Sequence, residues 1–211
     1  MTENGTVDIF APGSGARAYG PYPYRVRGRV RSGVVLWLAG RDDELDRVFA
    51  LPAETGAGPQ MPLFVTVRQA RVYASRRGRG PDPFEPGVLE LARVQHWLED
   101  PARRKLPPGA VLDAWNFFED LARGLDAPHE LPHQEKPHNS AYEKLFGGES
   151  AEWTPAEQGA VLELLTAGVE LWNSCPVVVN PRSRNRADSR SEIALRAGVN
   201  PGARALRGGP D

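Results

Sequence analysis

The order of strand-like and helix-like patterns along the chain constrains the fold more than any other feature of this sequence. Apolar and polar side chains alternate from Tyr24 to Arg31, which is typical of a half-buried β-strand. Ser32-Gly33 suits a tight turn, and the apolar run from Val34 to Ala39 predicts a second, more buried strand. Leu63 to Ala74 is rich in β-branched and aromatic residues, which predicts a third strand.

Helix patterns occur in the second half of the chain. Val111 to Ala122 places its apolar side chains on one helical face, and a weaker helix pattern covers Val88 to Leu98. Capping boxes at Ser140 to Glu143 and at Thr154 to Glu157 predict two more helix starts, the second helix running to about Asn173. Because strands precede helices, the sequence predicts an α+β fold: a small antiparallel sheet from the N-terminal half packed against three or four helices from the C-terminal half.

The two ends of the chain differ in composition from its middle. Residues 1–21 are rich in glycine and carry no pattern, and residues 180–211 consist largely of Arg, Asn, Ser and Gly. Such segments bury too little apolar surface to offset the entropy lost on ordering. We therefore expect a flexible N-terminus at residues 1–21, a single α+β domain at residues 22–179 and a disordered arginine-rich tail at residues 180–211.

The sequence also indicates a compartment. Cys175 is the only cysteine, so no disulfide can form within the chain, and a reducing compartment is the simpler interpretation. Met1 to Gly15 lacks the basic and apolar regions of a signal peptide, and the longest apolar run, Val34 to Ala39, is too short to span a bilayer. We expect a cytoplasmic location and no membrane association.

Charge is unevenly distributed along the chain, although the net charge is only −1. Residues 101–179 carry 12 acidic and 6 basic side chains, whereas residues 180–211 carry 7 arginines and 3 acids. An acidic helical half and a basic tail can neutralise each other. The charge distribution therefore does not favour a net electrostatic field that would attract nucleic acid to the whole protein.

Arginine occupies every second position of the first predicted strand, at Arg25, Arg27, Arg29 and Arg31. Side chains two residues apart on a strand share one face and lie roughly 6–7 Å apart. Guanidinium groups at this spacing suit phosphates or carboxylates, so the pattern predicts an anion-binding face whose partner is nucleic acid or an acidic protein. The alternatives are a solvated outer face, or a face that pairs with the acidic helices.

Three of the four histidines, His129, His133 and His138, lie within ten residues of one another. The letters from His129 to His133 match H-E-x-x-H, but Pro132 disrupts the helix that this zinc-protease motif requires, at roughly 3 kcal/mol. A looser site remains open, because neutral imidazoles with nearby carboxylates bind zinc or other divalent transition metals. The alternative is an exposed, proline-rich loop.

A further polar group follows the predicted helix at Val111 to Ala122, where Asp113, Asn116 and Asp120 share one face. Paired carboxylates can hold a metal or act as acid and base, but such a stripe is more often the wet side of an amphipathic helix. No phosphate-binding loop, serine elbow or C-x-x-C pair is present in the sequence.

These observations favour a non-enzymatic binding or interaction protein that holds an anionic partner through the arginine-lined strand face and uses no cofactor. The alternative hypothesis is a metal-dependent enzyme that uses His129, His133 and His138 together with nearby carboxylates, with zinc or another divalent transition metal as its cofactor.

Overall fold

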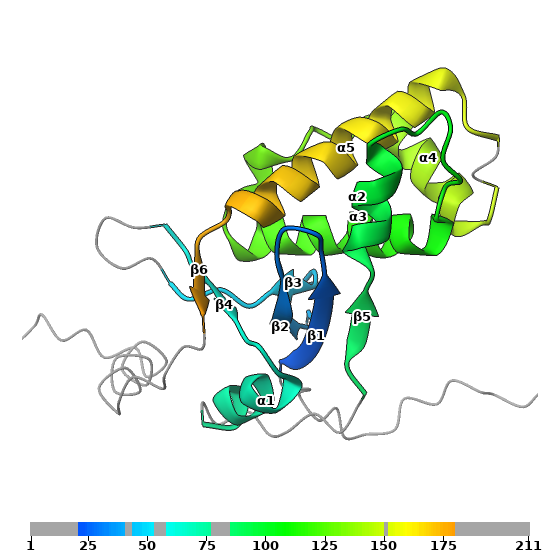
Figure 1. The fold of residues 1–211 in the computed structure, drawn as a ribbon. Helices are drawn as coiled ribbons and strands as arrows, with labels where there is room; N and C mark the ends of the chain where they lie inside the picture. The colour runs from blue at the N-terminus through cyan, green and yellow to red at the C-terminus, as the bar shows by residue number, and fades with distance from the viewer. Residues whose placement is uncertain (1–20, 41–43, 53–57, 77–84, 150–151, 180–211) are drawn as a thin grey trace, which may run out of the picture.

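The computed structural model describes residues 21–40, 44–52, 58–76, 85–149 and 152–179. Its strands are β1 (Tyr22–Arg27), β2 (Ser32–Leu38), β3 (Arg47–Val48), β4 (Met61–Leu63), β5 (Gly87–Leu89) and β6 (Val177–Val179). Its helices are α1 (Val67–Arg76), α2 (Leu91–Leu98), α3 (Pro108–Gly124), α4 (Lys136–Phe146) and α5 (Pro155–Ser174), with a short 3-10 helix, η1, at Pro128–Glu130. Figure 1 shows how these elements are arranged.

The main sheet has four strands in the order β3-β2-β1-β5. β1 and β2 form the predicted antiparallel hairpin, in which Tyr22 pairs with Trp37 and Arg27 with Ser32. The predicted turn at Ser32-Gly33 is wrong, because both residues belong to β2 and the connection lies at residues 28–31. The α+β prediction is confirmed, since the sheet comes from the N-terminal half and most helices come from the C-terminal half. β5, which the sequence placed in a helix, instead pairs parallel to β1, so the sheet is mixed.

A second, two-stranded sheet joins the two halves of the chain. β4 pairs parallel to β6, with Met61 opposite Val177 and Leu63 opposite Val179. Phe64, just after β4, bridges to β2: its N–H donates to the Val34 carbonyl at 2.9 Å, and the Val34 N–H donates to the Phe64 carbonyl at 2.8 Å. This bridge brings β4 and β6 beside the hairpin.

Two hydrophobic cores lie on opposite faces of the main sheet, which explains why β2 is an uninterrupted apolar run. Val35 and Trp37 face the larger core, built mainly from α2, α3, α4 and α5. Val34 and Leu36 face a smaller core that contains Phe64 and the buried side of α1. In Figure 1 the strands accordingly lie between α1 on one side and α2, α3, α4 and α5 on the other.

The helical layer is built on α3, whose Trp115, Phe117, Phe118 and Leu121 are buried. α5 begins at the predicted capping box: the Glu157 N–H donates to the Thr154 hydroxyl at 3.3 Å, and the Thr154 N–H donates to the Glu157 carboxylate at 2.7 Å. The predicted start at Ser140 is wrong, because α4 begins at Lys136. The Ser140 hydroxyl instead donates to Glu157, linking α4 to α5.

The third predicted strand, Leu63 to Ala74, is also wrong, because only Leu63 belongs to a strand and Val67–Arg76 form α1. Ala70, Tyr73 and Ala74 are buried at helical spacing. A capping box begins the helix: the Gln69 N–H donates to the Thr66 hydroxyl, and the Thr66 N–H donates to the Gln69 side chain, both at 3.2 Å. Reciprocal capping and burial of one face outweigh the strand preference of valine and tyrosine.

The predicted flexible N-terminus, apart from Pro21, and the predicted tail at residues 180–211 lie outside the described residues. Within the described segments, no helix combines the length and apolar character needed to cross a membrane.

Candidate anion-binding sites

The four predicted arginines do not form one row. β1 ends at Arg27, so Arg29 and Arg31 lie beyond the strand, at the tip of the hairpin. The alternation predicted within β1 holds, because Tyr24 and Val26 face the larger core. Val30, which the pattern also directed inward, is 78% exposed. The alternation therefore breaks at the hairpin tip, where the backbone leaves the extended conformation.

Arg27 and Arg29 pair with acidic side chains at the two ends of α2. The Arg27 guanidinium contacts the Glu90 carboxylate at 2.6 Å, and the Arg29 guanidinium contacts Glu99. The Arg29 backbone N–H also donates to the Gln95 side chain at 2.8 Å. These contacts dock the hairpin on α2, so for these two arginines the structure favours the alternative in which they pair with a helix.

Arg31 secures the C-terminal end of α5. Its guanidinium donates to the carbonyls of Trp172 at 2.7 Å, Asn173 at 2.8 Å and Cys175 at 3.1 Å. The last carbonyls of a helix lack partners within the helix, and a planar guanidinium can satisfy several at once. The guanidinium also lies 5.8 Å from the centre of the Trp172 ring system. Arg31 is therefore a structural residue.

Arg25 lies in a different setting, at the wall of a pocket of about 300 Å³. Arg25 pairs across the hairpin with Val34, which belongs to the smaller core, so both side chains share the α1 face of the sheet. The pocket is lined by Arg25, Val26, Arg27, Ser32, Gly33, Leu63, Phe64, Val65 and Val179. We call this hollow, with one basic and one apolar wall, the Arg25 pocket.

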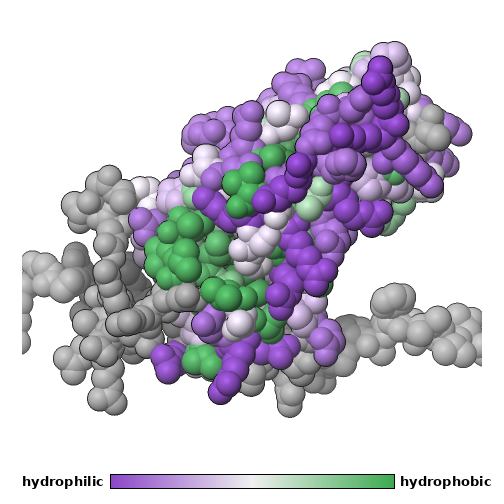
Figure 2. All heavy atoms as spheres, viewed as in Figure 1, coloured by the Kyte–Doolittle hydropathy of each residue, from purple (hydrophilic) through white to green (hydrophobic). Residues whose placement is uncertain are grey.

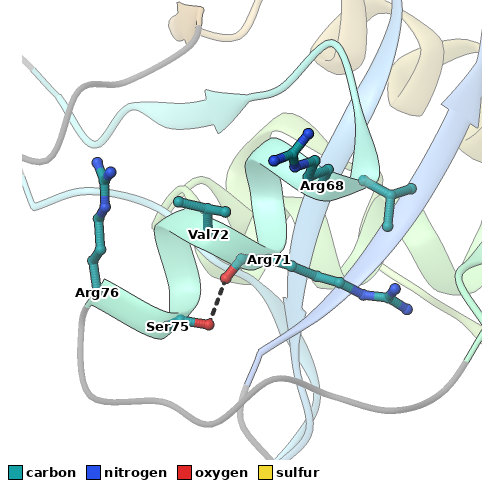
Figure 3. A pocket seen from close by; sticks show the side chains of 6 residues that line it. Arg68, Arg71, Val72, Ser75 and Arg76 are labelled. Atoms are coloured by element: carbon teal, nitrogen blue, oxygen red, sulfur yellow. Dashed lines mark hydrogen bonds between the residues drawn. The ribbon is translucent and has the colours of Figure 1, made fainter.

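α1 presents a second basic surface, which the strand prediction concealed. On a strand, Arg68 and Arg71 would point to opposite faces of the sheet. On a helix, side chains three residues apart occupy neighbouring positions. Arg68, Arg71 and Arg76 line one groove together with Val67, Val72 and Ser75. Figure 3 shows the three arginine side chains extending from α1. The Ser75 hydroxyl donates to the Arg71 carbonyl at 2.9 Å. The signal in the sequence was the capping pair Thr66 and Gln69.

The three predicted metal ligands are not brought together. His129 and His133 are exposed, and the nearest carboxylate to His129 is that of Glu130, 3.6 Å from its Nε2. His138 turns inward in the first turn of α4, is only 6% exposed and accepts the Glu135 N–H at 3.3 Å through Nδ1. Throughout the described part of the chain, no group of three or more His, Cys, Asp or Glu side chains could hold a metal ion.

The polar stripe on α3 is built into the fold. Asn116 accepts the Tyr142 hydroxyl at 3.0 Å, and Asp120 is buried and paired with Arg123. Burial raises the pKa of Tyr24 to about 12, and the neighbouring Asp113 carboxylate adds to this shift. Since Asn116 contacts α4, Asp113 lies beside Tyr24 of β1 and Asp120 is buried, we assign the stripe to packing between α3 and its neighbours rather than to catalysis.

Comparisons with protein-family models, with curated proteins and with solved structures gave no significant match to this chain. The functional argument therefore depends on the geometry of the sites described above.

Proposed function

We propose that this protein binds an acidic segment of a partner protein through the Arg25 pocket. The observation that supports this most directly is the position of the Arg25 guanidinium. Arg25 is half-buried in the pocket wall, and its side chain forms no hydrogen bond or ion pair with any residue that the structure describes. A carboxylate that enters this recess would form a charge-assisted pair that salt screens less than one at the open surface. The proposal requires no cofactor.

The second wall of the pocket favours a protein over a nucleic acid. Val65 is 61% exposed and Val179 is 58% exposed, and both lie beside Arg25. Arginine next to aliphatic side chains is typical of the central part of a protein interface, from which other charged residues are depleted. Nucleic acid requires several available cations along a track, whereas Arg27, Arg29 and Arg31 are already engaged within the fold.

The neighbouring β6 supplies a suitable backbone for such a segment. β6 pairs with β4 along one edge, and no other described strand pairs with it. Figure 2 shows an apolar patch over β4 and β6, and the three valines of β6 are half-buried or exposed. An extended peptide can add to an exposed strand edge through main-chain hydrogen bonds while its side chains enter adjacent pockets. We infer that the partner presents an extended segment with an aliphatic residue and a carboxylate.

Selection of displayed random linear peptides on the intact protein would test this proposal. We expect the selected peptides to carry Asp, Glu or a free C-terminal carboxylate next to aliphatic residues. Arg25→Ser should weaken their binding about tenfold or more, because a hydrogen bond to a charged group is typically worth ~1.5–3 kcal/mol. Arg47→Ser is the matched control, since Arg47 is exposed on β3 and lies outside the pocket.

Fluorescent DNA and RNA oligonucleotides, titrated into the same proteins, would test the other predicted class of partner. Tight nucleic-acid binding that Arg25→Ser abolishes would assign the pocket to nucleic acid and overturn the acidic-protein proposal. The proposal also fails if the selection enriches no acidic peptides, or if Arg25→Ser and the parent bind those peptides equally well.

A further inference from the structure

A further basic pocket, of about 320 Å³, lies between α2 and the segment that leads into α3, and we call it the α2 pocket. We propose that it binds the phosphate group of a small organic molecule. The pocket is lined by Ala92, Arg93, His96, Trp97, Arg104, Lys105 and Pro107. It shares no lining residue with the Arg25 pocket, so this inference does not depend on the function proposed above.

A tight turn after α2 assembles the pocket. The Asp100 N–H donates to the Trp97 carbonyl at 3.1 Å, and the Arg104 N–H donates to the Asp100 carbonyl at 3.0 Å. The chain thereby folds back along α2, and the Arg104 side chain contacts both the His96 carbonyl and the Glu99 carboxylate. On α2 itself, Arg93 and His96 are three residues apart and lie on neighbouring positions of one helical face. Local backbone geometry thus orients basic side chains from two segments toward one hollow.

Glu99 does not neutralise this cluster. Its single carboxylate contacts the guanidinium groups of both Arg29 and Arg104, and it also lies 3.5 Å from the Nδ1 of His96. One negative charge therefore neutralises only one of these two permanent positive charges. Glu99 itself does not line the pocket, so the surface that a ligand meets is basic.

Arg93 and Lys105 add two further positive charges that the fold does not use. Both side chains are exposed, and neither takes part in a hydrogen bond or ion pair within the described residues. A phosphate monoester carries close to two negative charges and three acceptor oxygens. A planar guanidinium fork and a mobile ammonium group can satisfy these oxygens together. The excess of positive charge thus favours a phosphate over a singly charged carboxylate.

The remaining walls limit the size of the ligand. Trp97 is only 3% exposed, and together with Pro107 and Ala92 it provides apolar surface beside the cationic groups. The volume of about 320 Å³ is at the lower end of the roughly 300–1,000 Å³ typical of small-molecule pockets. The pocket therefore suits a phosphate joined to a small organic group.

Titration of the intact protein with phenyl phosphate and with inorganic phosphate, followed by NMR and calorimetry, would test this site. We expect the backbone amides of residues 92–97 and 104–106 to shift, and the ester to bind more tightly than inorganic phosphate because its ring contacts the apolar wall. Arg93→Ser and Lys105→Ser should each weaken phenyl phosphate binding about tenfold or more. Arg103→Ser is the matched control, because Arg103 is 88% exposed, pairs only loosely with Asp100 at 3.9 Å and does not line the pocket.

The inference would be overturned by no shift of these amides, by equal binding of phenyl phosphate to the parent, Arg93→Ser and Lys105→Ser, or by binding of benzoate as tight as that of phenyl phosphate. Arg25→Ser separates the two proposals, since it should weaken acidic-peptide binding about tenfold or more and leave phenyl phosphate binding unchanged. Loss of phenyl phosphate binding in Arg25→Ser would place the phosphate in the other pocket and contradict the inference.

Discussion

Asp120 shows how far a single side chain can depart from the position that a helix pattern assigns to it. The pattern of α3 placed it on the wet face, but Asp120 is only 4% exposed and pairs with Arg123. Burial raises its pKa to about 6, and the hydrogen bond and charge of Arg123 oppose this shift without cancelling it. The ion pair with Arg123 thus offsets only part of the cost of burying the charged Asp120 carboxylate.

We predict that protonation of Asp120 stabilises the protein. Its folded pKa of about 6 lies above its ordinary value of 3.8, so between these pH values the folded chain binds more protons than the unfolded chain. The contribution of Asp120 to the free energy of unfolding therefore increases as the pH falls through this window. Chemical denaturation at a series of pH values should show the increase in the parent and not in Asp120→Asn.

Glu157→Gln provides the control, because Glu157 titrates in the opposite sense. Hydrogen bonds from the Ser140 hydroxyl and then the Thr154 N–H lower the pKa of Glu157 to about 2, from an ordinary 4.5. Its stabilising contribution is present above pH 4.5 and is lost as the pH falls toward about 2. Glu157→Gln should change the acid limb of the profile and leave the region near pH 6 unaltered. A parent-like slope near pH 6 in Asp120→Asn would refute the assignment to Asp120.

At the scale of elements, the sequence correctly predicts the helices and strands for which the local backbone preference and the pattern of burial agree. The hairpin, α3 and the start of α5 are in this class, because alternation, amphipathic spacing and the Thr154 capping box agree with the packing. α1 and β5 are not. Valine and tyrosine favour a strand where α1 forms, and β5 is only three residues long, too short for a periodic pattern. Contacts with residues distant in the sequence determine the structure of both segments, and these contacts cannot be read from a single sequence.

Two glycines of α5 offer a matched pair for testing packing within an element. A Cβ built on Gly168 would lie 2.1 Å from the Phe118 ring, whereas one built on Gly159 would meet nothing within 4 Å. Gly159→Ala should stabilise the protein by up to ~1 kcal/mol through helix propensity. Gly168→Ala should destabilise it by ~1–3 kcal/mol, because the buried ring must move. Urea denaturation measures both changes, and stabilisation by Gly168→Ala would show that α3 and α5 do not approach as closely as described.

At the scale of the whole molecule, the arginine row illustrates why the sites were only partly predictable. The alternation correctly placed Tyr24 and Val26 in the core and Arg25 on the opposite face. It could not show that Arg27 meets a carboxylate 63 positions away, or that Arg31 meets a helix end 141 positions away. The α2 pocket was missed for the same reason, since only the folded turn brings Arg104 and Lys105 beside Arg93. The run of basic residues at 103–105 was its one signal in the sequence.

The contact of Arg31 with α5 joins the N-terminal hairpin to the C-terminal helix, so its loss should affect the whole fold. Its guanidinium donates to three carbonyls, and the Trp172 indole N–H donates back to the Arg31 carbonyl at 3.3 Å. Arg31→Lys keeps the charge but lacks the planar fork, and we predict a loss of ~1–3 kcal/mol in the free energy of unfolding. Arg27→Lys is the control: its pair with Glu90 is exposed, so the change should be at most ~1 kcal/mol. Equal effects of the two substitutions, measured by urea denaturation, would mean that the planar fork of Arg31 adds nothing to the stability beyond its charge.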